Sequence, residues 1–308
     1  MGRLRPLRPL ALLAALALAP TAAGTPTLPV AVPAGDWQPL FEHTDAELES
    51  RLNARLKARA DWRKLLEKRR LAVGLVDLSD PAAPRFAHLN GQVEMYAASL
   101  PKIAILLAAF HQFEQGELAR SPEIEADLKA MIRFSDNAAA TRMIDRLGGL
   151  MAVNRVLADP RYGFYDSDGR GGLWVGKRYA KSGPRLPDPV RGISHAASVT
   201  QVCRFYYLLA TGRLISPQAS REMLTLLADP GLRHKFVRSL SRRAPQARLY
   251  RKSGTWKRWH ADSVLVWGPS WRRYILVAMA ESPDGEQILG DLVPAVEAVL
   301  QAPEDDDE

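Results

Sequence analysis

A serine and a lysine stand three residues apart at the start of an almost wholly apolar run. Ser99 and Lys102 flank Pro101, and residues 103–110 read IAILLAAF. Proline suits the first turn of a helix, and a continuous apolar run is typical of a helix buried on all sides. An offset of three stacks Lys102 against Ser99, where the helix N-terminus adds positive potential. A lysine that is partly desolvated has a lowered pKa and can accept the serine proton at neutral pH. The pair therefore predicts a nucleophile with its base.

Two further short motifs follow along the chain. Ser135-Asp136-Asn137 lies between two helical segments, and Lys252-Ser253-Gly254-Thr255 lies at the end of a predicted strand. Taken singly, the three motifs are typical of a helix cap, an Asx-type turn and a strand end. Taken in this order, they resemble the motifs of the penicillin-recognising serine hydrolases, and the S-D-N form resembles the class A β-lactamase branch. The flanking sequences resemble that branch over nearly the whole chain after the first residues.

The resemblance implies the roles in catalysis. Ser99 is the expected nucleophile, Lys102 its base or proton relay, and Ser135 the shuttle that carries the proton to the leaving nitrogen. The backbone N–H groups of Ser99 and Thr255 are expected to form the oxyanion hole that acyl transfer needs.

The resemblance also implies the substrate contacts. Asn137 would bond the amide side chain of the substrate, and Lys252 would supply positive charge beside Ser135 and the substrate carboxylate. Ser253 and Thr255 would add hydrogen bonds at that carboxylate. Asp136 is expected to hold the loop rather than to touch substrate.

One element of the class A pattern is absent. Class A β-lactamases carry E-x-x-L-N in the long loop after S-D-N, where the glutamate activates the water that removes the acyl group, but residues 159–195 contain no glutamate. We therefore expect slow deacylation. His195 and His260 are candidate replacement bases, because a histidine can take a proton near neutral pH. The alternative for both is a surface or capping residue.

These observations predict an active-site serine hydrolase that acylates Ser99 with a β-lactam or a related amide. A D,D-peptidase acting on D-alanyl-type cell-wall peptides is the alternative enzyme. A penicillin-binding sensor or acyl trap without turnover is the alternative from another class. The six histidines show no metal-ligand spacing, so we expect no metal and no cofactor. The basic residues are scattered without a nucleic-acid motif, and we expect a monomer without a nucleic-acid partner.

The elements that must position these motifs begin and end with strands. Strands are predicted at 71–77, 85–89, 247–252, 260–267 and 274–280, with one amphipathic helix over 45–69, several helices between 99 and 227, a long loop at 160–195 and a last helix near 286–301. This order predicts an α/β (α+β) fold, with a five-stranded antiparallel sheet flanked by helices and an inserted all-helical domain, like that of β-lactamases and transpeptidases. The expected sheet lobe covers about 37–92 and 228–302, and the helical lobe about 93–227, within a catalytic domain at 37–302.

The first residues are typical of an exported protein. Three arginines precede an apolar stretch and a Thr-Ala-Ala-Gly site, which predicts a signal peptide at 1–24, followed by a linker at 25–36. Residues 303–308 form an acidic tail. The apolar stretch is too short to span a bilayer, and no cysteine stands at the cleavage site, so we expect no membrane anchor after cleavage and a soluble periplasmic or secreted protein. The net charge of +8 includes the three signal arginines, which leaves a modest basic excess.

Overall fold

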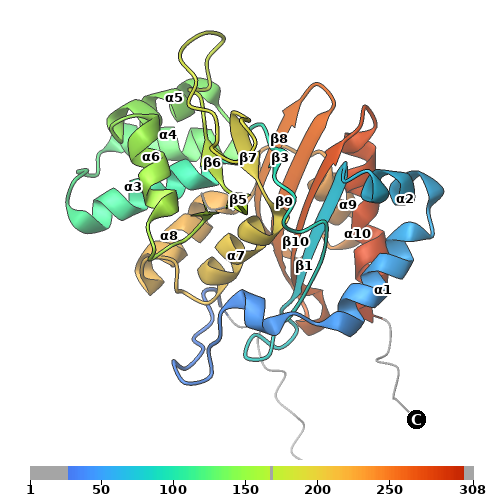
Figure 1. The fold of residues 1–308 in the computed structure, drawn as a ribbon. Coiled ribbons are helices and arrows are strands. Elements are labelled where there is room, and N and C mark those ends of the chain that lie inside the picture. The colour runs from blue at the N-terminus through green and yellow to red at the C-terminus, as the bar shows by residue number, and fades with distance from the viewer. Residues whose placement is uncertain (1–26, 167–168, 302–308) are drawn as a thin grey trace, which may run out of the picture.

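A five-stranded antiparallel sheet forms the centre of the protein (Figure 1). The computed structural model describes residues 27–166 and 169–301, so the predicted signal peptide, the start of the linker and the acidic tail lie outside the described residues. The strand order is β2-β1-β10-β9-β8, and every neighbouring pair is antiparallel. The strands are β1 (Leu71–Asp77), β2 (Arg85–Leu89), β8 (Arg248–Trp256), β9 (Trp259–Trp267) and β10 (Arg273–Glu281). The predicted sheet, built from both ends of the chain, is confirmed.

Helices cover both faces of this sheet (Figure 1). On β1, Leu71, Val73 and Leu75 belong to one hydrophobic cluster, and Ala72 and Val76 belong to the other. The alternation follows from the two-residue period of a strand, and it explains why the strand sequence is apolar throughout. The first cluster packs against α1 (Ala46–Lys57), α2 (Ala60–Glu67), α9 (Phe236–Arg243) and α10 (Gly285–Gln301). The second packs against α7 (Val199–Ala210) and the helices beyond it.

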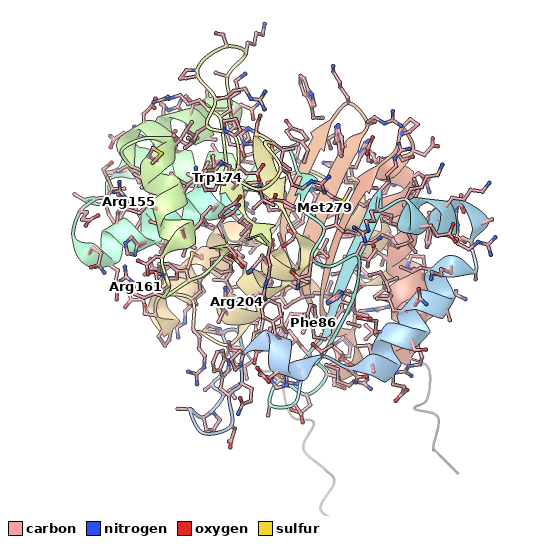
Figure 2. All side chains as sticks on the ribbon, viewed as in Figure 1. Phe86, Arg155, Arg161, Trp174, Arg204 and Met279 are labelled. Carbon is pink, nitrogen blue, oxygen red and sulfur yellow. The ribbon has the colours of Figure 1, made fainter. Side chains whose placement is uncertain are left out.

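The remaining helices lie on the α7 side of the sheet (Figure 1). They are α3 (Lys102–Gln115), α4 (Pro122–Arg133), α5 (Asn137–Arg146), α6 (Leu150–Ala158) and α8 (Pro217–Leu227). Figure 2 shows side chains filling the space between these helices and the sheet, with Trp174 on the helical side and Met279 on the sheet. Residues 103–110 of α3 are all buried, which agrees with the apolar run in the sequence.

Short elements connect the main ones. Two one-turn helices, η1 (Leu40–His43) and η2 (Ser270–Arg272), precede α1 and β10. Five strands of two or three residues form two small sheets, β3-β7-β6 and β4-β5. These strands are β3 (Met95–Tyr96), β4 (Tyr165–Asp166), β5 (Gly171–Gly172), β6 (Trp174–Val175) and β7 (His195–Ala197).

Three sequence predictions need correction. The helix predicted over 45–69 is two helices, α1 and α2, because Arg59 takes an extended conformation between them. The predicted strand at 247–252 continues to Trp256, so the Lys252 motif lies inside β8 rather than at its end. The long loop at 160–195 contains short strands, of which β6 pairs with β7 and anchors the loop beside Ser99.

Candidate active site

The turn that carries Ser99 lies between β3 and α3. Ser99 is partly exposed. The preceding Ala98 has φ of 51°, a left-handed conformation that is uncommon for residues other than glycine. The turn is tied to β7, because Ala97 N donates to His195 O at 2.8 Å. Backbone strain of this kind persists where surrounding contacts enforce it, as at active sites.

Gly254 of β8 allows the sheet edge to approach this turn. A Cβ built at Gly254 would lie 2.1 Å from Ala97 O and 2.6 Å from Ser99 N. Any side chain at this position would therefore collide with the backbone of the turn that carries Ser99. The glycine of the K-S-G motif is thus required for close approach of β8 to the Ser99 amide.

Lys102 begins α3 and is completely buried. Its Nζ donates to Ser135 O at 2.6 Å and to Asn137 Oδ1 at 2.7 Å, and it lies 3.3 Å from Ser135 Oγ. Burial lowers the pKa of Lys102 to about 7, and the carboxylate of Asp136 opposes that shift. With two N–H groups bound to strong acceptors, a neutral amine retains a lone pair for a hydroxyl proton.

Ser135 lies between two lysines. Lys252 Nζ donates to Ser135 Oγ at 2.9 Å, and Lys102 Nζ lies 3.3 Å from the same oxygen. Ser135 has φ of 59°, and the next residue, Asp136, is the N-cap of α5, where its Oδ1 accepts from Ala139 N at 2.7 Å. Asp136 therefore holds the loop, and the α5 helix start fixes the serine between the two amines.

Lys252 lies inside β8 and is also buried. Its Nζ donates to Ser253 O at 2.8 Å, and Ser263 Oγ donates to its backbone carbonyl at 2.8 Å. Burial lowers the pKa of Lys252 well below its usual value, and the nearby Lys102 lowers it further. Ser253 is buried, whereas Asn137 and Thr255 are exposed, so an incoming ligand can reach the outer part of this group.

A third buried lysine was not found from the sequence. Lys235 Nζ donates to Thr255 Oγ1 at 2.7 Å, to Gly254 O at 2.6 Å and to Ala261 O at 3.0 Å. Burial lowers the pKa of Lys235 to about 8. In the sequence Lys235 stands within the polar run RHK before α9, which is typical of a surface segment, so no signal marked it as buried.

A buried ion pair supports this lysine cluster from the far side of the sheet. Arg251 donates to both carboxylate oxygens of Asp262 at 2.7 and 2.8 Å, and their side chains are 2% and 0% exposed. Arg251 also donates to Leu232 O, and Phe236 N donates to Asp262 Oδ2. The pair fixes the segment that carries Lys235 against β8 and β9.

Replacing Arg251 with methionine should lower the free energy of unfolding by about 3–5 kcal/mol, because Asp262 would then be buried without its guanidinium partner. Urea unfolding measures this loss, and Arg242→Met, at an exposed arginine of α9, is the matched control. The double variant Arg251→Met/Asp262→Leu should recover a large part of the loss. An Arg251→Met protein as stable as the wild type would contradict the prediction.

The two candidate histidines lie in different places. His195 is buried in β7, and its ring stacks on Tyr179 with centroids 4.3 Å apart. Burial lowers the pKa of His195 to about 3, so the ring is neutral at pH 7.

His260 pairs with Thr255, and a Cβ built at Gly285 of α10 would lie 2.5 Å from His260 Cδ2. His260 therefore faces α10, whereas Ser263, which pairs with Lys252, faces Tyr206 of α7. The structure thus brings His195, but not His260, to the face that carries Lys252.

The loop residue that reaches Lys102 is Tyr179. Its ring centroid lies 4.5 Å from Lys102 Nζ, and its hydroxyl donates to Ala98 O at 3.3 Å. No motif marked this tyrosine in the sequence. Only the folded loop shows that it contacts both Lys102 and the turn before Ser99.

The described residues also bear on the cofactor and membrane predictions. Within residues 27–166 and 169–301, no group of three His, Cys, Asp or Glu side chains is arranged to hold a metal ion. No helix in the described part of the chain combines the length and apolar character needed to cross a membrane.

Comparisons with known proteins identify a family and a fold for this chain. The profile described as "Beta-lactamase enzyme family" matches residues 57–127 and 120–300. Among solved structures, a beta-lactamase from Sphaerobacter thermophilus is 22% identical with a TM-score of 0.64, covering 82% of this chain and 97% of that one. PBP-A is 18% identical with a TM-score of 0.61, covering 84% and 97%.

A class A beta-lactamase described as the last common ancestor of Gram-negative bacteria is 19% identical with a TM-score of 0.61, covering 83% of this chain and all of that one. No curated protein matches the sequence. The structural matches support the predicted β-lactamase-like fold. Since the family profile covers most of the chain, and the S-x-x-K, S-D-N and K-S-G residues meet around Ser135, this chain belongs to the beta-lactamase enzyme family.

Proposed function

We propose that this protein is an exported serine hydrolase that forms an acyl-enzyme at Ser99 with a carboxylate-bearing amide, either a β-lactam or a D-alanyl-type peptide. The observation that carries the proposal is the position of the Ser135 hydroxyl between Lys102 and Lys252, at 3.3 and 2.9 Å. A mutant of the structurally similar PBP-A is known as an acyl-enzyme complex with penicillin G. Export rests on the N-terminal sequence alone.

Acylation would proceed through the side chains around Ser99. Lys102, in its amine form, takes the proton of Ser99 Oγ, which attacks the substrate carbonyl. The backbone N–H groups of Ser99 and Thr255 stabilise the oxyanion, and the close approach of Gly254 to Ser99 N supports this pairing. The proton then passes from Lys102 to Ser135, which already lies 3.3 Å from Lys102 Nζ in the free protein, and from Ser135 to the leaving nitrogen.

Positive charge on β8 and its neighbours would select an anionic substrate. Lys252 contacts Ser135, and Lys235 contacts Thr255, so two buried lysines lie behind the exposed threonine of the motif. A substrate carboxylate at Ser253 and Thr255 would receive charge-assisted hydrogen bonds in a partly desolvated setting. We therefore propose Lys252 as the main carboxylate anchor and Lys235 as its support.

Replacing Lys252 with alanine should weaken reaction with a carboxylate substrate more than with its methyl ester, by on the order of 2–3 kcal/mol. The ratio of acylation rate constants for acid and ester separates this effect from the contact between Lys252 and Ser135, which both substrates share. Lys257→Ala, an exposed lysine beyond the motif, is the control. Equal losses for acid and ester would remove Lys252 from the anchor role.

Deacylation is proposed to be slow. The loop side chain that contacts Lys102 is Tyr179, whose pKa is raised well above its usual value by burial, so it is a neutral phenol and not a base. His195, behind it, is a weak base because its pKa is lowered to about 3. The same arrangement favours a penicillin-binding acyl trap as the second candidate function, and the D,D-peptidase alternative uses the same first step.

Intact-mass measurement during reaction with penicillin G tests the proposal. The expected result is an adduct of the full penicillin mass that accumulates and then decays over many minutes. An adduct that never decays identifies the acyl trap. Release of D-alanine from a peptide ending in D-alanyl-D-alanine identifies the peptidase. Absence of any adduct with both β-lactams and D-alanyl peptides would contradict the proposed function.

A further inference from the structure

Tyr179 contacts two parts of the proposed acylation machinery, Lys102 and the turn before Ser99, and it also contacts His195. Its ring face lies over Lys102 Nζ, at 4.5 Å from the centroid, and its hydroxyl donates to Ala98 O, the residue before Ser99. The ring also stacks on His195, with centroids 4.3 Å apart and an angle of 1° between the ring planes. These three contacts, with Lys102, His195 and Ala98 O, leave the ring little freedom to turn away from the lysine.

The ring is held by elements on both sides. His195 belongs to β7, which pairs with β6 of the loop and with β3 of the nucleophile turn. Tyr96 of β3 packs against His195 with centroids 6.2 Å apart and against Trp259 of β9 at 6.0 Å. The position of Tyr179 is therefore coupled to the turn of Ser99 and not only to its own loop.

The charges that face Lys102 come from several elements. Asp136 at the start of α5 attracts an ammonium, whereas Lys252 of β8 repels one. Ser135 O and Asn137 Oδ1 accept its hydrogen bonds, and His195 is neutral. The π-face of Tyr179 adds a second source of negative potential, since aromatic faces attract cations.

We propose that Tyr179 is a positioning residue for the nucleophile turn and that its ring face stabilises the ammonium form of Lys102 during acylation. This inference rests on the proposed function. In the step concerned, the O–H bond of Ser99 breaks and an N–H bond forms on Lys102 as Ser99 Oγ bonds to the substrate carbonyl carbon. The amide C–N bond then breaks, and a proton passes from Lys102 through Ser135 to the leaving nitrogen. The ring stabilises Lys102 only while the amine carries the extra proton.

A series of substitutions at position 179 tests this proposal, because each keeps an aromatic ring of nearly the same shape. Tyr179→Phe removes only the hydroxyl, and incorporation of mono-, di- and trifluorinated phenylalanines at position 179 then weakens the π-face stepwise. Titration of Lys102 by ¹³C NMR of labelled lysine, assigned with Lys102→Arg, should show its pKa falling by about one unit across the series, since an aromatic–cation contact of this size corresponds to about a tenfold change in protonation.

Acylation rates give the second readout. The wild-type rate should fall below about pH 7, where Lys102 becomes protonated. With fluorination, this acid limb should move to lower pH, because the ammonium is less stable, and the plateau rate should drop about tenfold. A purely structural role of Tyr179 would lower the rate without moving the limb.

Phe164 supplies the control, because it is a buried aromatic residue of the same loop and carries a different cation, Arg204, over its ring at 4.8 Å. The same fluorinated residues at Phe164 should leave the Lys102 titration unchanged. If the pKa of Lys102 stays the same in every variant at position 179, the inference is overturned. The proposed function is unaffected by that result as long as the wild type is acylated. The titration needs no substrate, so a wild type that is never acylated would instead overturn the proposed function.

Discussion

Replacing Ser99 with alanine should abolish covalent labelling by β-lactams, with a loss of about 10⁴-fold or more in acylation rate, because the variant lacks the hydroxyl that is proposed to attack the substrate carbonyl. The fold should be unaffected. Within the described residues the Ser99 hydroxyl makes no hydrogen bond, and the contacts of the turn run through backbone atoms of Ala97 and Ala98. Intact-mass spectrometry measures the labelling.

The labelling of Ser99→Ala has to be compared with that of a serine variant of equal stability. Ser241→Ala, at an exposed serine of α9, is the matched control and should label like the wild type. The free energies of unfolding of both variants, measured by thermal unfolding, should agree with that of the wild type within about 1 kcal/mol. Changes of this size are usual at residues without packing or polar contacts. Full labelling of Ser99→Ala by penicillin would remove Ser99 from the role of nucleophile.

Much of the fold was predictable because its elements are locally consistent. The strands at 71–77 and 274–280 are continuous apolar runs of the length that a strand covered on both faces requires, and they pair in full register as β1 and β10. The S-x-x-K pair was predictable as well. Pro101 and the apolar run after it fix the helix start, and Lys102 is the first residue of α3.

Other features depend on tertiary contacts that no local pattern encodes. Lys235 and Arg251 belong to polar segments, and their burial follows from acceptors on other elements, such as Ala261 O and Asp262. His260 is close to the Lys252 motif along the chain, but the alternation of side chains along β9 directs it to the α10 face. The break between α1 and α2 at Arg59 was hidden by a leucine pattern that continues through it.

Tyr179 was unpredictable for the same reason, and it leads to the second large effect. Replacing Tyr179 with glutamate should shorten the lifetime of the penicillin adduct on the order of 10²-fold, because a well-placed general base contributes about 10²–10⁴ in rate. The phenol ring lies 4.5 Å from Lys102 Nζ beside the Ser99 turn, so a carboxylate there can bond the lysine and a water that attacks the Ser99 ester.

The same variant should acylate more slowly at neutral pH. A carboxylate beside Lys102 favours its ammonium form, which raises its pKa above the value of about 7 and leaves less amine to accept the Ser99 proton. Tyr179→Gln is the matched control, since it has the same length but neither a charge nor a basic oxygen. Intact-mass spectrometry after removal of free penicillin gives the adduct lifetimes. If the adducts of Tyr179→Glu and Tyr179→Gln decay at the same rate, slow release in the wild type does not come from the lack of a carboxylate at this position.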